Sequence, residues 1–201
     1  MTQPTPSSRR YEKTRQGILD AARAILLEQG VQAISMRTLA EKVDYSPAAL
    51  YKYFSNKEEI IEALRQEAWA LLAAHEPEVE PGMSLGEIFI QSGRSYVDFA
   101  TRYPEYYLLM MSTVEGGPAS LAAFKQDPNF LSLLQFMEAA VAAGEFKVPD
   151  GYTTFHMTLL SWFSVHAVAL LKLTMMSQCA DEFEATSLEV FQMICGFFSA
   201  K

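Results

Sequence analysis

Apolar side chains recur at helical spacing along nearly the whole chain, and no other feature of the sequence limits the fold as strongly. Ile18, Ala22, Ile25 and Leu26, for example, lie three or four residues apart, which places them on one face of a helix. We find no stretch of alternating apolar and polar residues of the kind that predicts a half-buried strand. Ten glycines and nine prolines among 201 residues also leave few positions for turns. The chain is therefore predicted to be all-α, with about nine helices.

Capping residues mark where these helices begin. The first helix is predicted over Arg9–Gln29. Ser35 can cap a short second helix, and Ser46 with Pro47 starts a third that ends near Phe54, because an N-cap hydroxyl and a proline at the first helical position both favour helix initiation. Similar signals start the later helices: Ser55 with Glu58, Ser84 with Glu87, Pro104, Asp127 with Pro128, and Asp181 with Glu184.

Positive charge is concentrated at the start of the chain, although the formal net charge of the whole is −8. Residues 1–57, which we call the head, carry nine Lys and Arg against five acidic residues. Residues 58–201, the body, carry seven against nineteen. Clustered positive charge is the electrostatic signature of nucleic-acid binding. The head and the body are therefore expected to have different partners, and DNA is a partner for the head.

The two short helices of the head, joined by a tight turn and backed by the first helix, match the arrangement of a helix-turn-helix motif. Small residues at the start of the third helix let it approach base edges closely, and the tyrosines and lysines that follow can donate to phosphates. Core packing is the alternative for aromatic residues such as Phe54. The predicted DNA-contacting residues are Arg9, Arg10, Arg37, Thr38, Ser46, Pro47, Ala48, Ala49, Tyr51, Lys52, Tyr53 and Lys57.

The segment Leu39–Ile60 resembles the DNA-binding signature of the tetracycline-repressor (TetR) family. That signature has an alanine, a Gly-Val-Ser turn, then Leu-Tyr, an aromatic residue or histidine, Phe and Lys. The chain matches it at Ala40, Ser46, Leu50, Tyr51, Tyr53, Phe54 and Lys57. It departs at Asp44 and Tyr45, where the family usually has glycine and valine. Aspartate tolerates a left-handed backbone better than most residues, so we expect the turn to survive.

Two segments of the body, Tyr103–Met110 and Trp162–Ala167, are similar to the subgroup of that family named for a Trp-His-Gly signature, with Ala167 in place of the glycine. The resemblance implies an all-helical regulatory domain whose last two helices form a homodimer, and a pocket for an effector. Trp162 and His166 are four residues apart and so share a helix face. A core histidine bonded to a backbone carbonyl is the alternative interpretation.

The body is rich in aromatic and methionine side chains, and most of these must belong to the core. Methionine adapts its shape readily, which suits a pocket for apolar molecules. We therefore expect a small lipophilic effector, either neutral or cationic. The predicted effector-contacting residues are Tyr96, Phe99, Tyr107, Met111, Phe136, Trp162 and His166.

Other functional classes find little support in the sequence. The three histidines are not spaced as metal ligands, and HExxH, CxxC, P-loop and GxSxG patterns are absent. We therefore predict no cofactor, no metal and no catalytic residue. Residues 152–171 lack charged side chains and are long enough to span a membrane, but they contain hydroxyl and imidazole groups and lack a basic flank. We predict a bundle helix in a cytoplasmic protein, whose two cysteines fit a reducing compartment.

These observations predict a homodimeric transcriptional regulator, specifically a repressor, that binds a pseudo-palindromic double-stranded DNA operator and is released by the effector. We expect a disordered tail over residues 1–8, a three-helix helix-turn-helix domain over 9–56, and a C-terminal helical bundle over 57–201 for effector binding and dimerisation. Three alternatives stay open. They are an activator or a regulator controlled by a protein partner, a helical enzyme, and a membrane-anchored protein.

Overall fold

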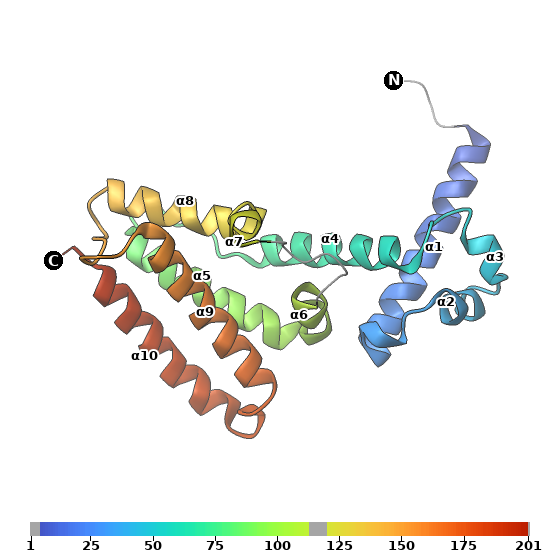
Figure 1. Cartoon of the computed structure of the whole chain (residues 1–201). Helices are drawn as coiled ribbons and strands as arrows, with labels where there is room; N and C mark the ends of the chain where they lie inside the picture. The colour runs from blue at the N-terminus through green and yellow to red at the C-terminus, as the bar shows by residue number, and fades with distance from the viewer. Residues whose placement is uncertain (1–4, 113–119, 201) are drawn as a thin grey trace. The chain divides into compact units, whose positions relative to one another are not determined.

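A computed structural model describes residues 5–112 and 120–200, and the fold is all-α as predicted (Figure 1). Among these residues, extended backbone pairs only at an isolated antiparallel bridge between Phe146 and Ser199. The helices of the described part are α1 (Pro6–Gln29), η1 (Val31–Ala33), α2 (Met36–Lys42), α3 (Pro47–Leu50), α4 (Lys57–His75), α5 (Leu85–Arg102), α6 (Pro104–Met111), α7 (Leu121–Phe124), α8 (Pro128–Ala142), α9 (Thr154–Leu173), η2 (Ser177–Cys179) and α10 (Ala180–Phe198).

The chain forms two compact units. Unit 1 consists of Met1–Ala73 and Glu105–Val114, and so contains α1 to α3, α4 up to Ala73, and α6 apart from its first residue. Unit 2 consists of Ala74–Pro104 and Glu115–Lys201, and contains α5 and α7 to α10. The functional boundary predicted between residues 56 and 57 stays a prediction, because compactness alone does not test it.

A small apolar core forms where α2 packs against α1 and α3 in unit 1. The apolar residues whose spacing predicted α1 all face this core and are buried. Leu39 of α2 and Leu50 of α3 are fully buried as well. Between these two helices Asp44 adopts a left-handed φ of 56°. This confirms the prediction that aspartate can take the place of the usual glycine in this turn.

The first helix begins earlier than predicted, and the third ends earlier. α1 begins at Pro6 rather than near Arg9, because the Thr5 hydroxyl accepts a hydrogen bond from the Ser8 N–H at 3.2 Å and caps it. Residues 5–8 of the predicted tail therefore form the cap and the first turn, whereas residues 1–4 lie outside the described residues. α3 ends at Leu50 instead of Phe54, and residues 51–53 form a turn.

The start of α4 differs from the predicted capping box by one residue. The Asn56 Oδ1 atom accepts the Glu59 N–H at 2.9 Å, and the Glu59 carboxylate accepts the Ser55 N–H at 2.7 Å. Asparagine and serine are both good N-cap residues, so local propensity alone did not separate them. The predicted starts of α5 and α6 are confirmed, and Ser84 and Glu87 form the reciprocal capping box at α5.

In unit 2, α9 packs against α5, α8 and α10, and α5 packs against α10 (Figure 1). Gly86 lets α5 and α10 approach closely, because a Cβ atom there would lie 3.2 Å from the Cys195 Sγ atom. The core of this unit consists of Met137, Ala140, Phe146, Met157, Ile194, Cys195 and Phe198.

The long apolar helix predicted from residues 152–171 is α9. By length and composition alone, α9 could cross a membrane. Only 28% of its apolar window is buried within the chain. Exposed apolar side chains lie three or four residues apart on both α9 and α10, so they form a stripe on each helix. We call these two stripes together the α9–α10 face. It consists of Leu160, Phe163, Ala167, Leu170, Val190, Met193 and Phe197.

Candidate nucleic-acid interface and effector site

Two predicted DNA contacts, Arg37 and Thr38, lie in the first turn of α2. The Ser35 Oγ atom accepts the Thr38 N–H at 3.1 Å, and the Thr38 Oγ1 atom accepts the Ser35 N–H at 3.0 Å. The Thr38 hydroxyl is thus used to cap the helix. Arg37 is exposed, and its Nε atom donates to Glu41 at 3.0 Å. Exposed ion pairs of this kind are weak, so Arg37 is able to exchange Glu41 for a phosphate.

α3 is held against the core by one face and presents the other to solvent. The Ser46 Oγ atom accepts the Ala49 N–H at 3.2 Å, so this hydroxyl also caps a helix. Leu50 is fully buried, whereas Tyr51 one residue later is 56% exposed. The exposed residues on or next to α3 are Tyr45, Ser46, Pro47, Ala48, Tyr51 and Lys52.

The start of α1 lies beside the turn that follows α3. The rings of Tyr11 and Tyr53 pack with their centroids 5.0 Å apart. The Arg15 guanidinium lies 4.5 Å from the centroid of the buried Phe54 ring, a cation–π contact. These contacts fix the first turns of α1 next to the residues predicted to bind DNA.

The remaining basic side chains among the predicted DNA contacts lie on α1, in the turn after α3 and at the start of α4. Arg9 and Arg10 are exposed and lie within α1. Lys52 follows α3, and Lys57 is the first residue of α4; both are exposed. Unit 1 therefore carries exposed basic side chains on the helix-turn-helix and on the helices next to it. Which of these side chains touch DNA stays a prediction.

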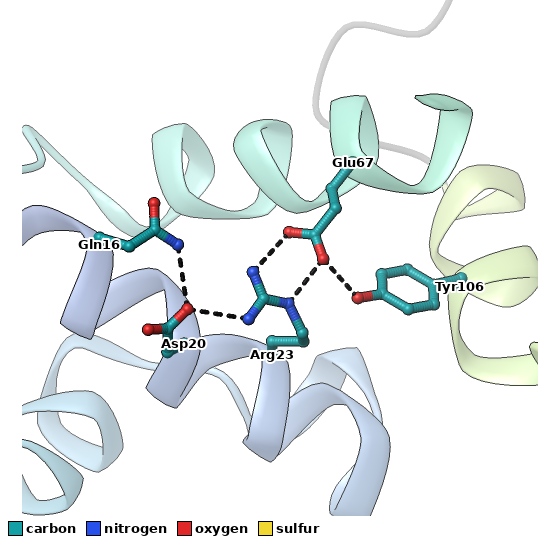
Figure 2. Close-up of polar contacts among 5 residues, drawn as sticks. All are labelled: Gln16, Asp20, Arg23, Glu67 and Tyr106. Carbon is teal, nitrogen blue, oxygen red and sulfur yellow. Dashed lines mark hydrogen bonds and ion pairs between the residues drawn. The ribbon is translucent and has the colours of Figure 1, made fainter. Parts of the chain in front are cut away.

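A charged network joins three helices of unit 1, as Figure 2 shows. The Arg23 Nε and Nη2 atoms on α1 donate to the two carboxylate oxygens of Glu67 on α4, at 2.6 and 2.9 Å. The Tyr106 hydroxyl on α6 donates to the same carboxylate at 2.7 Å. The Arg23 Nη1 atom donates to Asp20 at 2.9 Å, and the Gln16 side chain donates to Asp20 at 3.0 Å. A bidentate Arg–carboxylate pair fixes orientation as well as distance.

The pKa values of the network residues follow from these contacts. The hydrogen bonds from Arg23 lower the pKa of Glu67, even though partial burial acts in the opposite direction. Burial and the bond to Glu67 raise the pKa of Tyr106 to about 12. Glu67 is therefore ionised and Tyr106 is neutral over the physiological pH range. Sequence reasoning missed this network, because Glu67 is 44 residues from Arg23 and 39 from Tyr106 along the chain.

Three of the predicted effector-contacting residues meet in unit 2. The Tyr96 hydroxyl on α5 lies 3.1 Å from the His166 Nδ1 atom on α9, and the rings of Trp162 and His166 have their centroids 4.4 Å apart. Phe124 and Phe130 pack edge-on against Trp162. Burial lowers the pKa of His166 to about 4, so the imidazole is neutral at physiological pH.

The other predicted effector-contacting residues fall into two groups, two in unit 2 and two in unit 1. Phe99 packs with His75 and Tyr103, and Phe136 stacks on Phe89. Tyr107, which is buried, and Met111, which is exposed, belong to α6 in unit 1. Within unit 2 the structure thus groups Tyr96, Trp162 and His166 into one cluster, and it places Phe99 and Phe136 in other aromatic groups.

A separate cavity of about 390 Å³ lies between α5, α9 and α10 in unit 2, and none of the predicted effector residues lines it. The buried Lys172 of α9 pairs with Glu184 of its lining. In the described part of the chain, His, Cys, Asp and Glu side chains nowhere gather in the groups of three that a metal ion needs.

Residues 18–64 match the sequence model of the family described as bacterial regulatory proteins, tetR family. The nicotine-responsive transcriptional repressor HdnoR of Paenarthrobacter nicotinovorans is 35% identical over 68 residues, which are 34% of this chain and 35% of that protein. The curated relatives considered are matched over 26% to 35% of their own length. The sequence similarity therefore concerns the helix-turn-helix and the residues next to it.

Solved structures are similar over nearly the whole chain. A regulatory protein of the tetR family from Rhodococcus RHA1 aligns with a TM-score of 0.64 at 17% identity, over 94% of this chain and 98% of that one. A TetR variant from Acinetobacter baumannii AYE, solved in complex with minocycline, aligns with a TM-score of 0.60 at 17% identity, over 90% and 94% of the two chains. At such low identity the likeness establishes the fold.

Proposed function

We propose that the protein is a homodimeric transcriptional repressor of the tetR family that binds an operator through α2 and α3 and releases it when a small lipophilic molecule binds the body. The observation that carries this proposal is the set of exposed basic side chains Arg37, Lys52 and Lys57, which lie within the segment that matches the family. The acidic body repels phosphate, so the head is the part that approaches DNA.

Dimerisation through α9 and α10 follows from their exposed apolar stripes. Isolated exposed apolar residues are ordinary, but contiguous apolar surfaces mark interfaces. Phe163, Met193 and Phe197 are 60%, 67% and 64% exposed in the single chain. A second copy that covers the α9–α10 face would pair two recognition helices. These would enter successive major grooves about 34–36 Å apart, or at a multiple of that distance, on a pseudo-palindromic site.

The effector site is proposed at the cluster of Tyr96, Trp162 and His166. Its ring faces are apolar, its imidazole is neutral, and its hydroxyl can orient a polar atom of the ligand. These properties suit a lipophilic aromatic molecule, neutral or cationic. One relative is named as nicotine-responsive, and one structural neighbour was solved with minocycline. Both ligands named there are ring-containing small molecules, which supports the class proposed for this chain.

Release of DNA is proposed to act through α4. In unit 1 the Glu67 side chain of α4 holds α1 through Arg23 and α6 through Tyr106. In unit 2 the last residue of α4, His75, pairs with Asp98 of α5 at 2.9 Å, and the Ser95 hydroxyl donates to the His75 carbonyl at 2.7 Å. An effector that binds more tightly to one arrangement of α4 shifts the population toward it.

The proposal is tested by selecting bound duplexes from a random DNA pool with the full-length protein, and then measuring affinity for the recovered sequence. Lys57→Ala and Tyr53→Ala are expected to weaken binding at least tenfold, because each removes a donor to the DNA backbone. Lys147→Ala removes the same charge from an exposed position of the body and serves as the matched control.

Recovery of a two-fold symmetric sequence and loss of affinity only in the two head variants would support the proposal. Failure to enrich any duplex, or equal effects of all three substitutions, would contradict it. A transcription assay on the recovered site, with and without aromatic amines such as nicotine, then determines the sign of regulation. In that assay an activator increases transcription and a repressor decreases it. Cell fractionation tests the remaining alternative, because a membrane-anchored protein would be found in the membrane fraction.

A further inference from the structure

The side chains that α3 presents to solvent are unusual for a helix that reads DNA bases. Residues 45–54, all of which the structure describes, include no Arg, Asn, Gln, Asp or Glu. Arginine pairs with guanine, asparagine and glutamine with adenine, and carboxylates with cytosine in the major groove. Within residues 45–54 the only side chain that offers one of these pairings is Lys52, in the turn after α3, and the nearest carboxylate is Asp44, in the turn before it.

The polar groups that remain on α3 are used locally or lie at its end. The Ser46 hydroxyl accepts the Ala49 N–H and caps the helix. Lys52 follows the last residue of α3, where its long side chain can reach phosphates. The Tyr53 ring packs against Tyr11. The first turn of α3 thus presents chiefly the apolar groups of Pro47 and Ala48, both of which are exposed.

Exposed methyl and methylene groups have one distinctive partner in the major groove, the C5-methyl group of thymine. A short side chain also lets the helix backbone come close, so that the contact is made at van der Waals distance. Tyr45 precedes Pro47 and Ala48 in the sequence and Tyr51 follows them, and these tyrosines are 45% and 56% exposed. Their rings can extend the apolar contact, or their hydroxyls can donate to the DNA backbone.

We infer that α3 recognises thymine methyl groups through Ala48 and Pro47, so that each operator half-site carries thymines opposite the start of this helix. This inference rests on the proposed function and adds the chemistry of the recognised bases. The competing readers of the sequence are Arg37, which is 85% exposed beside Glu41, and Lys52. Either of them would select guanine instead.

The experiment replaces individual thymidines of the selected duplex by deoxyuridine, which removes only the methyl group and keeps the base pair. A buried methyl contributes about 0.8 kcal/mol, or roughly a fourfold change in affinity at 25 °C. At one or two positions in each half-site, wild-type affinity is expected to fall about three- to fivefold per methyl. Thymidines outside the half-sites should show no effect and serve as the internal control.

The variant Ala48→Gly assigns the contact, with Ala139→Gly on an exposed position of α8 as the matched substitution. Glycine weakens a helix generally, so the informative quantity is the ratio of affinities for the thymidine and deoxyuridine duplexes. This ratio should fall toward one in Ala48→Gly at the position that Ala48 contacts, and it should be unchanged in Ala139→Gly.

Two results would overturn the inference while leaving DNA binding intact. One is a wild-type protein indifferent to every thymidine replacement. The other is a guanine-rich half-site whose recognition is lost in Arg37→Ala or Lys52→Ala. If selection recovers no duplex at all, the proposed function itself fails, so the two failures are distinguishable.

Discussion

Glu67 keeps its negative charge because three hydrogen-bond donors converge on its carboxylate. Two come from the Arg23 guanidinium and one from the Tyr106 hydroxyl. Hydrogen bonding to the ionised form lowers the pKa of this carboxyl group. A group whose pKa is lower in the folded than in the unfolded state stabilises the fold above its unfolded pKa. That contribution is lost as pH falls through the folded value.

We predict that Glu67→Gln lowers the free energy of unfolding by about 1–2 kcal/mol at pH 7, because a charge-assisted network is replaced by weaker neutral bonds. The difference from wild type should shrink at pH 3, below the ordinary glutamate pKa of about 4.3, since Glu67 of the unfolded chain is then protonated and the stabilisation decreases as pH falls toward the lower folded pKa. Urea unfolding at the two pH values measures it. Tyr106→Phe removes only one donor, so it should lower the free energy of unfolding by less than Glu67→Gln. If the difference in free energy between wild type and Glu67→Gln were as large at pH 3 as at pH 7, the role of the network would be contradicted.

His166 gives a second prediction at the residue scale. Burial lowers its pKa to about 4, so the imidazole should not gain a proton between pH 8 and pH 5. Its ring-proton NMR signals should stay constant over that range in the folded protein. In urea they should titrate near 6.5, the ordinary value. Titration of the folded protein near neutral pH would mean that the proposed effector site carries a positive charge, which disfavours a cationic ligand.

Among the elements, the turn between α2 and α3 sets the geometry of the proposed DNA-binding surface. Asp44 holds a left-handed φ of 56° there. Asp44→Gly should preserve or raise stability, because glycine adopts this conformation without steric cost. Asp44→Val should lower stability by about 1–2 kcal/mol, since a β-branched residue resists it. The midpoints of urea unfolding are measured for wild type and both variants. Equal midpoints for the valine and glycine variants would show that the left-handed backbone at residue 44 causes no strain.

The helices were predictable from the sequence where local chemistry decides them. Ser35, Ser46 and Ser84 each accept the backbone N–H that the sequence pattern assigned to them. The end of α3 was not predictable, because burial of Phe54 depends on contacts with the rest of the unit. The three-helix contacts of Glu67 were out of reach for the same reason. Short-range patterns carry no information on which distant side chains meet.

The cluster proposed as the effector site was predictable only in part. The four-residue spacing of Trp162 and His166 placed them on one face of α9, and their rings do pack together. Tyr96 joins them from α5, seventy residues away in sequence, and was selected only as one aromatic residue of the body. Phe99 and Phe136 have the same residue type but pack in other aromatic groups. Residue type alone did not distinguish these cases.

At the scale of the whole molecule, the α9–α10 face is predicted to hold two chains together. Phe163→Glu places a charge in the centre of the proposed interface and should convert dimers to monomers in sedimentation velocity. Leu121→Glu, at another exposed apolar residue outside this face, should leave the dimer intact. A monomeric wild type, or a Phe163→Glu variant that still dimerises, would contradict this assignment of the interface.

If the basic head binds duplex DNA in two symmetric copies, the affinity for the operator must depend steeply on salt concentration. Fluorescence anisotropy of a labelled selected duplex gives the affinity between 50 and 200 mM KCl. If the dimer neutralises about six or more phosphates, affinity should fall by roughly a thousandfold or more over this range. Lys57→Ala, present twice per dimer, should reduce the slope of log affinity against log salt by about two. An affinity independent of salt, or a stoichiometry of one chain per operator, would contradict the account.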